Sequence, residues 1–189
     1  MKASLLGCGR HGPPYRVRQF VRALAPVAPA EVEAALRASS LPDDAARLFR
    51  AMPQPYQRHA LNVAARLSQE GHTEPLLLSA ALLHDIGKWD PASGRSVGLL
   101  HRVAATLLRR VGPGRALLER LGSGNPSPRS PRYPWRLQQR HPALGAGLAQ
   151  RAGVDPDVVA LVLHHEDADG LPPHLRGALA LLQRADDQE

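Results

Sequence analysis

The sequence predicts an all-α protein, and three observations support this fold class. Of the 189 residues, 43% are hydrophobic but only 4% are aromatic, and Ala and Leu dominate the apolar set. Such a composition favours helices, whereas a sandwich or barrel needs more β-branched and aromatic residues. Apolar residues recur at helical spacing, and no strand-like alternation interrupts them. The length suits one domain with a sizeable core.

The first half of the chain predicts a row of helices. Apolar residues at helical spacing, with arginines opposite, predict a helix over residues 14–24. Proline and acidic residues suit a first turn, so we expect helices over residues 29–37 and from residues 41–44 onward. An amphipathic helix over residues 55–70 ends at Gly71.

The following segment is apolar nearly all round, which predicts the central buried helix. It begins at residues 73–75 and is expected to end at residues 86–87. Five more helices follow, and a loop rich in Gly, Ser and Pro separates the second from the third over residues 122–134. The five expected helices are residues 96–111, 114–121, 141–152, 156–165 and 173–186. Asp155 is the expected N-cap of the fourth.

Composition excludes several classes of protein. The single cysteine, Cys8, rules out an internal disulfide framework and fits a reducing compartment. No apolar run approaches the roughly 20 residues of a membrane-spanning helix. We therefore expect a soluble, cytoplasmic protein without a membrane partner.

Basic residues are concentrated in the middle of the chain. Residues 88–140 carry a formal charge of +9, and Lys88 is the one lysine besides Lys2 among 24 basic residues. Such a stretch can attract an anionic small molecule or a nucleic acid, although solvated arginine faces are the commoner explanation. No aromatic platform for bases accompanies it, so a nucleic-acid partner is unsupported.

The pair His84-Asp85 is the most informative local feature. It follows the apolar run of residues 76–83 and precedes Ile86-Gly87-Lys88. Burying an imidazole beside a carboxylate costs free energy unless something pairs with both groups, and a divalent ion such as Zn, Fe or Mn can do so. A surface pair, or a core histidine oriented by a carboxylate, is the alternative. Lys88 is suited to bind a phosphate oxygen. The alternative is a solvated lysine at the C-terminal end of a helix.

Further imidazoles and carboxylates occupy similar positions at helix ends or beside apolar faces. A helical bundle aims metal ligands inward from such positions. The candidate ligands are His59, His84, Asp85, His141, His164, His165 and Asp186.

The order of these residues resembles the HD superfamily of metal-dependent phosphohydrolases. The resemblance covers residues 59–187, and residues 84–88 have the HDIG form of the motif. Residues 141–145 and 164–170 resemble the HD-GYP branch. That branch carries Gly-Tyr-Pro after an Asp-Gly pair, but here Leu171 and Pro172 follow Asp169-Gly170, which argues against hydrolysis of cyclic dinucleotides.

The resemblance implies a role for each residue. One metal would be held by His59, His84, Asp85 and Asp186. Asp85 would bridge to a second metal held by His141, His164 and His165. Lys88 would bind a substrate phosphate, with Asp85 as the second catalytic residue, and Glu166 would orient a ligand. Asp186 resembles the family motif better than its neighbour Asp187, although the residues alone leave both possible.

The resemblance also implies a fold and an activity. We expect a single-domain HD-fold helical bundle, with residues 53–189 as the metal-binding domain and residues 1–52 as a helical extension packed on it. The implied activity is hydrolysis of a nucleotide-like phosphomonoester or phosphodiester by metal-bound hydroxide, with two ions of Fe, Mn or Zn. An HD-fold di-iron oxygenase and a non-catalytic module that binds nucleotide or RNA are the alternatives.

Overall fold

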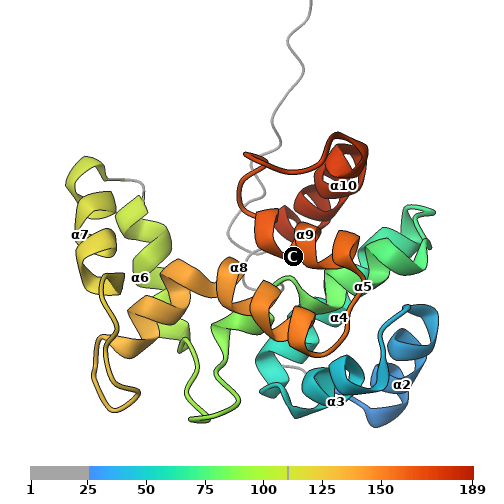
Figure 1. Ribbon diagram of the computed structural model, residues 1–189, viewed down its shortest axis with the longest axis horizontal. Coiled ribbons are helices and arrows are strands. Elements are labelled where there is room, and N and C mark those ends of the chain that lie inside the picture. Colours follow the sequence, from blue (N-terminus) through green and yellow to red (C-terminus); the bar gives the residue numbers. More distant parts are fainter. Residues whose placement is uncertain (1–25, 110) are drawn as a thin grey trace, which may run out of the picture.

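The protein is all-α, as the computed structural model of residues 26–109 and 111–189 shows (Figure 1). Within these residues no strand forms, and Trp89 and Ser96 make an isolated antiparallel bridge. The helices are α2 (Pro29–Ala38), α3 (Asp43–Ala51), α4 (Gln54–Gln69), α5 (Pro75–Leu83), α6 (Leu99–Arg109), α7 (Gly112–Gly122), α8 (Tyr133–Arg151), α9 (Pro156–His164) and α10 (Arg176–Asp187), with 3₁₀ turns η1 (Ile86–Lys88) and η2 (Pro173–Leu175). The helix expected over residues 14–24 lies outside the described residues.

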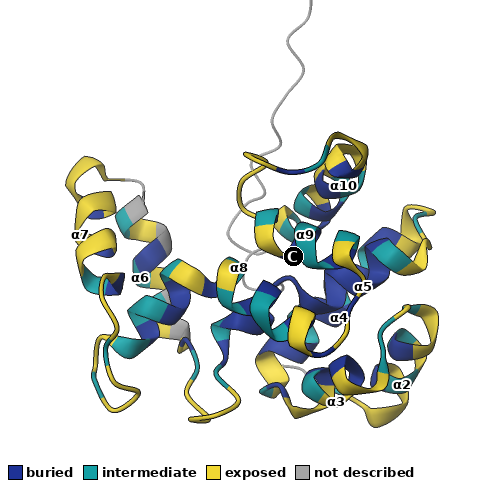
Figure 2. Ribbon diagram, in the orientation of Figure 1, coloured by how far each residue is buried: buried dark blue, intermediate teal, exposed yellow. Residues whose placement is uncertain are grey.

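Helix α5 is the buried centre that the sequence predicts. Every residue from Leu77 to Leu83 is buried, and Figure 2 shows this helix dark blue along most of its length. The helix ends at Leu83, earlier than the expected end at residues 86–87, because Asp85 leaves helical geometry and the chain tightens into η1. This early end places His84 and Asp85 at a junction between two helical segments.

Helix α8 begins much earlier than expected. The sequence predicts a helix over residues 141–152, but the observed helix starts at Tyr133 and continues through Pro142. Proline removes one backbone N–H, which normally disfavours a helix interior. Helix α6 starts at Leu99 rather than Ser96, because Ser96 is held in the bridge to Trp89.

The described helices form one hydrophobic core with an attached arm. Buried residues of α2 to α5, α8, α9 and α10 share a single cluster, in which Phe49 of α3 and Val32 of α2 take part. Helices α6 and α7 stand to the side of this body, and α8 connects the two parts (Figure 1). Within the described residues, no helix has both the length and the apolar character needed to span a membrane.

Candidate metal centre

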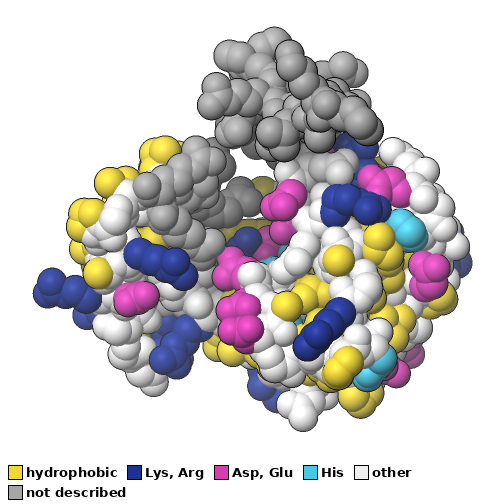
Figure 3. Space-filling model, turned by 90° about the horizontal axis from the view of Figure 1, so that it is seen from above, with side chains coloured by type: hydrophobic (Ala, Val, Ile, Leu, Met, Phe, Trp, Pro, Cys, Tyr) yellow, Lys and Arg dark blue, Asp and Glu magenta, His cyan; other side chains and the backbone are white. Residues whose placement is uncertain are grey.

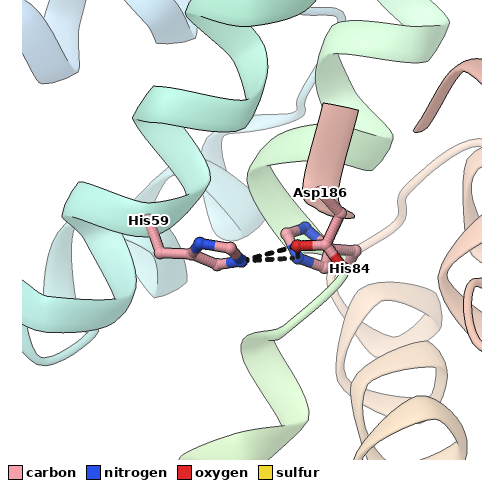
Figure 4. Close-up of side chains that lie close together, drawn as sticks. All are labelled: His59, His84 and Asp186. Atoms are coloured by element: carbon pink, nitrogen blue, oxygen red, sulfur yellow. Dashed lines mark hydrogen bonds and ion pairs between the residues drawn. The ribbon is translucent and has the colours of Figure 1, made fainter. Parts of the chain in front are cut away.

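Three side chains from distant parts of the chain meet in a first ligand group. His59 comes from the middle of α4, His84 caps the end of α5, and Asp186 lies near the end of α10 (Figure 4). The His59 and His84 Nε2 atoms are 3.2 Å apart, and Asp186 Oδ1 lies 2.9 Å from His59 Nε2 and 3.5 Å from His84 Nε2. These atoms can hold one metal ion.

A second group lies deeper in the protein. It consists of Asp85, His141 of α8 and His165, which caps α9, and all three are buried. The His141 and His165 Nε2 atoms are 3.0 Å apart, and Asp85 Oδ1 lies 3.5 Å from His141 Nε2 and 3.7 Å from His165 Nε2. This group can hold another ion.

The Asp85 carboxylate lies between the two groups. Its Oδ1 atom faces the second group and is also 3.8 Å from His84 Nε2, while its Oδ2 atom is 3.7 Å from His59 Nε2. Lys88 Nζ donates to Oδ2 at 2.7 Å. A single carboxylate therefore reaches donors of both groups, which is the arrangement that a bridging ligand requires.

Backbone carbonyls set the tautomer of the three buried imidazoles. The Nδ1 atoms of His84, His141 and His165 lie 2.8–2.9 Å from the carbonyl oxygens three residues earlier, at Ala81, Gln138 and Val162 respectively. A carbonyl oxygen only accepts hydrogen bonds, so each Nδ1 carries the proton and, in the neutral ring, each Nε2 presents a lone pair. Ring orientation by such a bond is typical of metal-binding histidines.

These three carbonyl oxygens lack a helical N–H partner because of their positions in the helices. Ala81 and Val162 belong to the last turns of α5 and α9, where carbonyls lack helical partners. Gln138 lies inside α8, but its partner four residues on would be Pro142, which has no N–H to donate. Pro142 therefore leaves the Gln138 carbonyl available for His141.

The charge states of the buried groups are compatible with a cation at the centre. Burial lowers the pKa values of His141 and His165, assisted by the charges of Lys88 and His84 respectively. Two neutral rings whose lone pairs face each other at 3.0 Å repel unless a cation lies between them. The donor set thus fits a divalent ion.

The pKa values of Asp85 and His84 are shifted by the charges around them. Burial raises the pKa of Asp85, but the charges of Lys88 and the surrounding imidazoles outweigh it and hold that pKa well below its usual range. Burial lowers the pKa of His84, but Asp85 and Asp186 outweigh it and raise the pKa to about 9. The two carboxylates therefore favour the protonated form of His84.

Ion pairs between the C-terminal ends of α10 and α4 position Asp186. Glu189 accepts from Arg66 at 3.0 Å, and Arg184 donates to Glu70 at 2.7 Å. Ala185 is fully buried, which fixes the rotation of the helix. Of the two candidates left open by the sequence, Asp186 joins the ligand group, whereas Asp187 lies exposed on the cleft described below.

The structure does not bring every candidate together. His164 belongs to neither group, although the sequence resemblance assigns it to the second metal; its ring lies against Gly170. Residues 164 and 165 are adjacent, so their side chains leave the α9 terminus in different directions. Glu166 Oε1 is 3.8 Å from His141 Nε2, at the edge of the second group.

Gly87 allows the two metal-binding segments to approach each other. A Cβ atom at this position would lie 2.1 Å from the His141 carbonyl oxygen and 2.6 Å from the Gly145 nitrogen. Only a residue without a side chain permits this approach of η1 to the α8 backbone. The glycine of the motif thus places Asp85 beside His141.

A cleft of about 940 Å³ opens onto both groups. Asp85, His165 and Asp186 line its floor, and Lys88 also reaches it; Arg115 and Glu119 of α7 line it as well. The sequence reasoning missed the two α7 residues, since nothing in their local pattern distinguishes them from other exposed helix positions. A smaller cavity of about 360 Å³ lies between Trp89, Tyr133 and Arg136, and none of the ligand residues lines it.

Comparison of the chain with protein-family models, with curated proteins and with solved structures found no match. The two His and Asp groups, which can hold metal ions, define the class of site: a candidate metal centre at a polar cleft.

Proposed function

We propose that this protein is a metal-dependent phosphohydrolase of the HD superfamily, acting on a nucleotide-like phosphomonoester or phosphodiester. The observation that carries the proposal is the pair of three-ligand groups joined by Asp85 at the base of an open cleft. A closed structural site would leave no room for substrate, whereas this one is reached from solvent.

The residues provide a set of roles for phosphoester hydrolysis. His59, His84 and Asp186 would hold one ion, and His141 and His165 the other, with Asp85 shared. When bound, two divalent ions of Fe, Mn or Zn supply Lewis acidity toward a phosphoryl oxygen and make water a stronger nucleophile.

Lys88 completes the proposed site. Its ammonium group is bonded to Asp85 and lines the cleft, so it lies where a phosphate oxygen approaching the bridging carboxylate would arrive. A compact ammonium is a common phosphate ligand, which favours phosphate chemistry over activation of oxygen. Glu166, near His141, would orient the second ion's ligands.

The first experiment measures metal content by mass spectrometry on protein purified without chelator and without air, followed by hydrolysis of chromogenic phosphomonoesters and phosphodiesters. We expect about two ions per chain. His59→Ala and His141→Ala should each lose about one ion, and Asp85→Asn should weaken both sites and lower activity about 100-fold or more. His174→Ala, which alters an exposed pair with Asp157, is the control and should change neither value.

Three results would contradict the proposal. Full metal content and activity in both His84→Ala and Asp85→Ala would show that the ligand assignment is wrong. Oxygen-dependent turnover without hydrolysis, in an iron-loaded protein, would indicate an oxygenase. Tight nucleotide binding without turnover with any of the three metals would indicate a binding module.

A further inference from the structure

The cleft has two unlike walls. The metal-binding side comes from the α5–η1 junction, the segment after α9 and helix α10. Arg115 and Glu119 come from α7, which belongs to the arm beside the main body. Figure 3 looks onto the hollow between these two parts, with acidic side chains along the margin of the main body. A substrate that reached the metals would therefore pass close to α7.

The cleft is not broadly positive, despite the basic stretch over residues 88–140. Six carboxylates and two basic side chains line it, so two divalent ions would bring the formal charge of the lining to neutrality. Among the described basic side chains of that stretch, Lys88 and Arg115 are the two that line the cleft. An anionic substrate must be recognised by these particular cations, not by a general positive field.

The two cations differ in availability. Lys88 is 16% exposed and is engaged by Asp85 at 2.7 Å. Arg115 is exposed, and it makes neither a hydrogen bond nor an ion pair with any residue that the structure describes. A free guanidinium presents a planar fork of donors that matches two phosphate oxygens at once.

We propose, on the basis of the phosphohydrolase function above, that Arg115 is a specificity-determining residue that binds a second phosphate of the substrate. One phosphoryl group would bind at the metal-ligand groups and Lys88, and a phosphate linked to it would bind Arg115. The substrate class is a phosphoester with two linked phosphates, such as a nucleoside diphosphate or a pyrophosphate-linked compound. The size of the cleft, well above that of a single phosphate, accommodates such a compound.

Isothermal titration of Mn-loaded full-length protein with inorganic phosphate and with pyrophosphate tests this assignment. In Arg115→Ala, pyrophosphate should bind about tenfold or more weakly, because charge-assisted hydrogen bonds are lost, while phosphate binding changes less than about twofold. Arg115→Lys should fall between, since it keeps the charge but not the fork. Arg120→Ala removes the same charge from α7 outside the cleft lining and should bind both anions like the wild type.

The assignment is overturned if pyrophosphate binds the wild type no more tightly than phosphate, or if Arg115→Ala weakens both anions equally or neither. The readout is independent of turnover. A selective loss of pyrophosphate binding in a protein that hydrolyses no phosphoester would overturn the proposed function and leave the Arg115 anion site standing. Hydrolysis of a phosphoester without a selective loss of pyrophosphate binding in Arg115→Ala would overturn the Arg115 assignment and leave the proposed function standing.

Discussion

At the scale of single residues, the centre is built from imidazoles that are already oriented. Hydrogen bonds to backbone carbonyls fix Nδ1–H on His84, His141 and His165, so that their Nε2 atoms converge. The two groups differ in protonation: the carboxylates raise the pKa of His84 to about 9, whereas burial lowers the pKa values of His141 and His165. We therefore expect metal binding to release a proton from His84, but none from His141 or His165.

This difference predicts how metal affinity depends on pH. His141→Ala isolates the first group, and its affinity for Mn²⁺ should rise about tenfold per pH unit from pH 6.5 to 8.5, because His84 releases one proton below its pKa of about 9. His59→Ala isolates the second group and should show a nearly flat profile. Titration calorimetry in buffers of different ionisation enthalpy counts the protons released, and a flat profile for His141→Ala would refute the prediction.

At the scale of elements, the junction of α5 and η1 against α8 determines the geometry of the centre. The early end of α5 turns His84 and Asp85 toward different groups, and Gly87 then lets η1 lie directly on the α8 backbone. Pro142 contributes from the other side by leaving the Gln138 carbonyl to His141. Residues 84–88 thus supply metal ligands and also pack η1 against α8.

Gly87→Ala should disrupt this junction. Its Cβ would lie 2.1 Å from the His141 carbonyl oxygen, an atom of a helix backbone that cannot move aside cheaply. We expect the free energy of unfolding to fall by at least about 2–3 kcal/mol, with loss of metal content. The control is Gly147→Ala in the same helix, where the new methyl group meets a flexible Arg151 side chain at 3.4 Å. Urea unfolding should show that this variant is unchanged or slightly more stable.

At the scale of the whole molecule, the ligands tie together helices that are distant in sequence. His59 of α4 and Asp186 of α10 are more than 100 residues apart in the sequence, and the second group joins the α5–η1 junction to α8 and α9. A metal that binds these ligands only in the folded state stabilises that state by mass action. We therefore expect metal binding at this centre to stabilise the folded core.

Removal of metal should lower the melting temperature measurably. With free metal at 100 times the dissociation constant, each bound ion contributes about 2.7 kcal/mol, which corresponds to roughly 5–10 °C for a chain of this size. Scanning calorimetry with Mn²⁺ and with chelator measures the shift. The Asp85→Asn variant should lose most of this shift in melting temperature. A shift as large as that of the wild type would show that the metal stabilises the protein at another site.

Much of the fold could be predicted from the sequence, because helical periodicity and apolar runs report burial directly. The central position of α5 and the helix content are confirmed by the structure. The start of α8 was predicted wrongly, since local rules treat Pro142 as a helix boundary while packing on η1 retains it inside the helix. Likewise, the sequence pattern groups His164 with His165, although the rotation of α9 presents His165 alone to the ligand group.

The sequence by itself determined the all-α class and the set of imidazoles and carboxylates from which the centre is built, because both follow from residue type and periodicity. Only the tertiary structure decided which of them meet: Asp186 rather than Asp187, His165 rather than His164, and Asp85 between the two groups. These choices depend on helix rotation and on contacts between segments more than 100 residues apart, such as Arg184 with Glu70. Local spacing carries no information about such contacts.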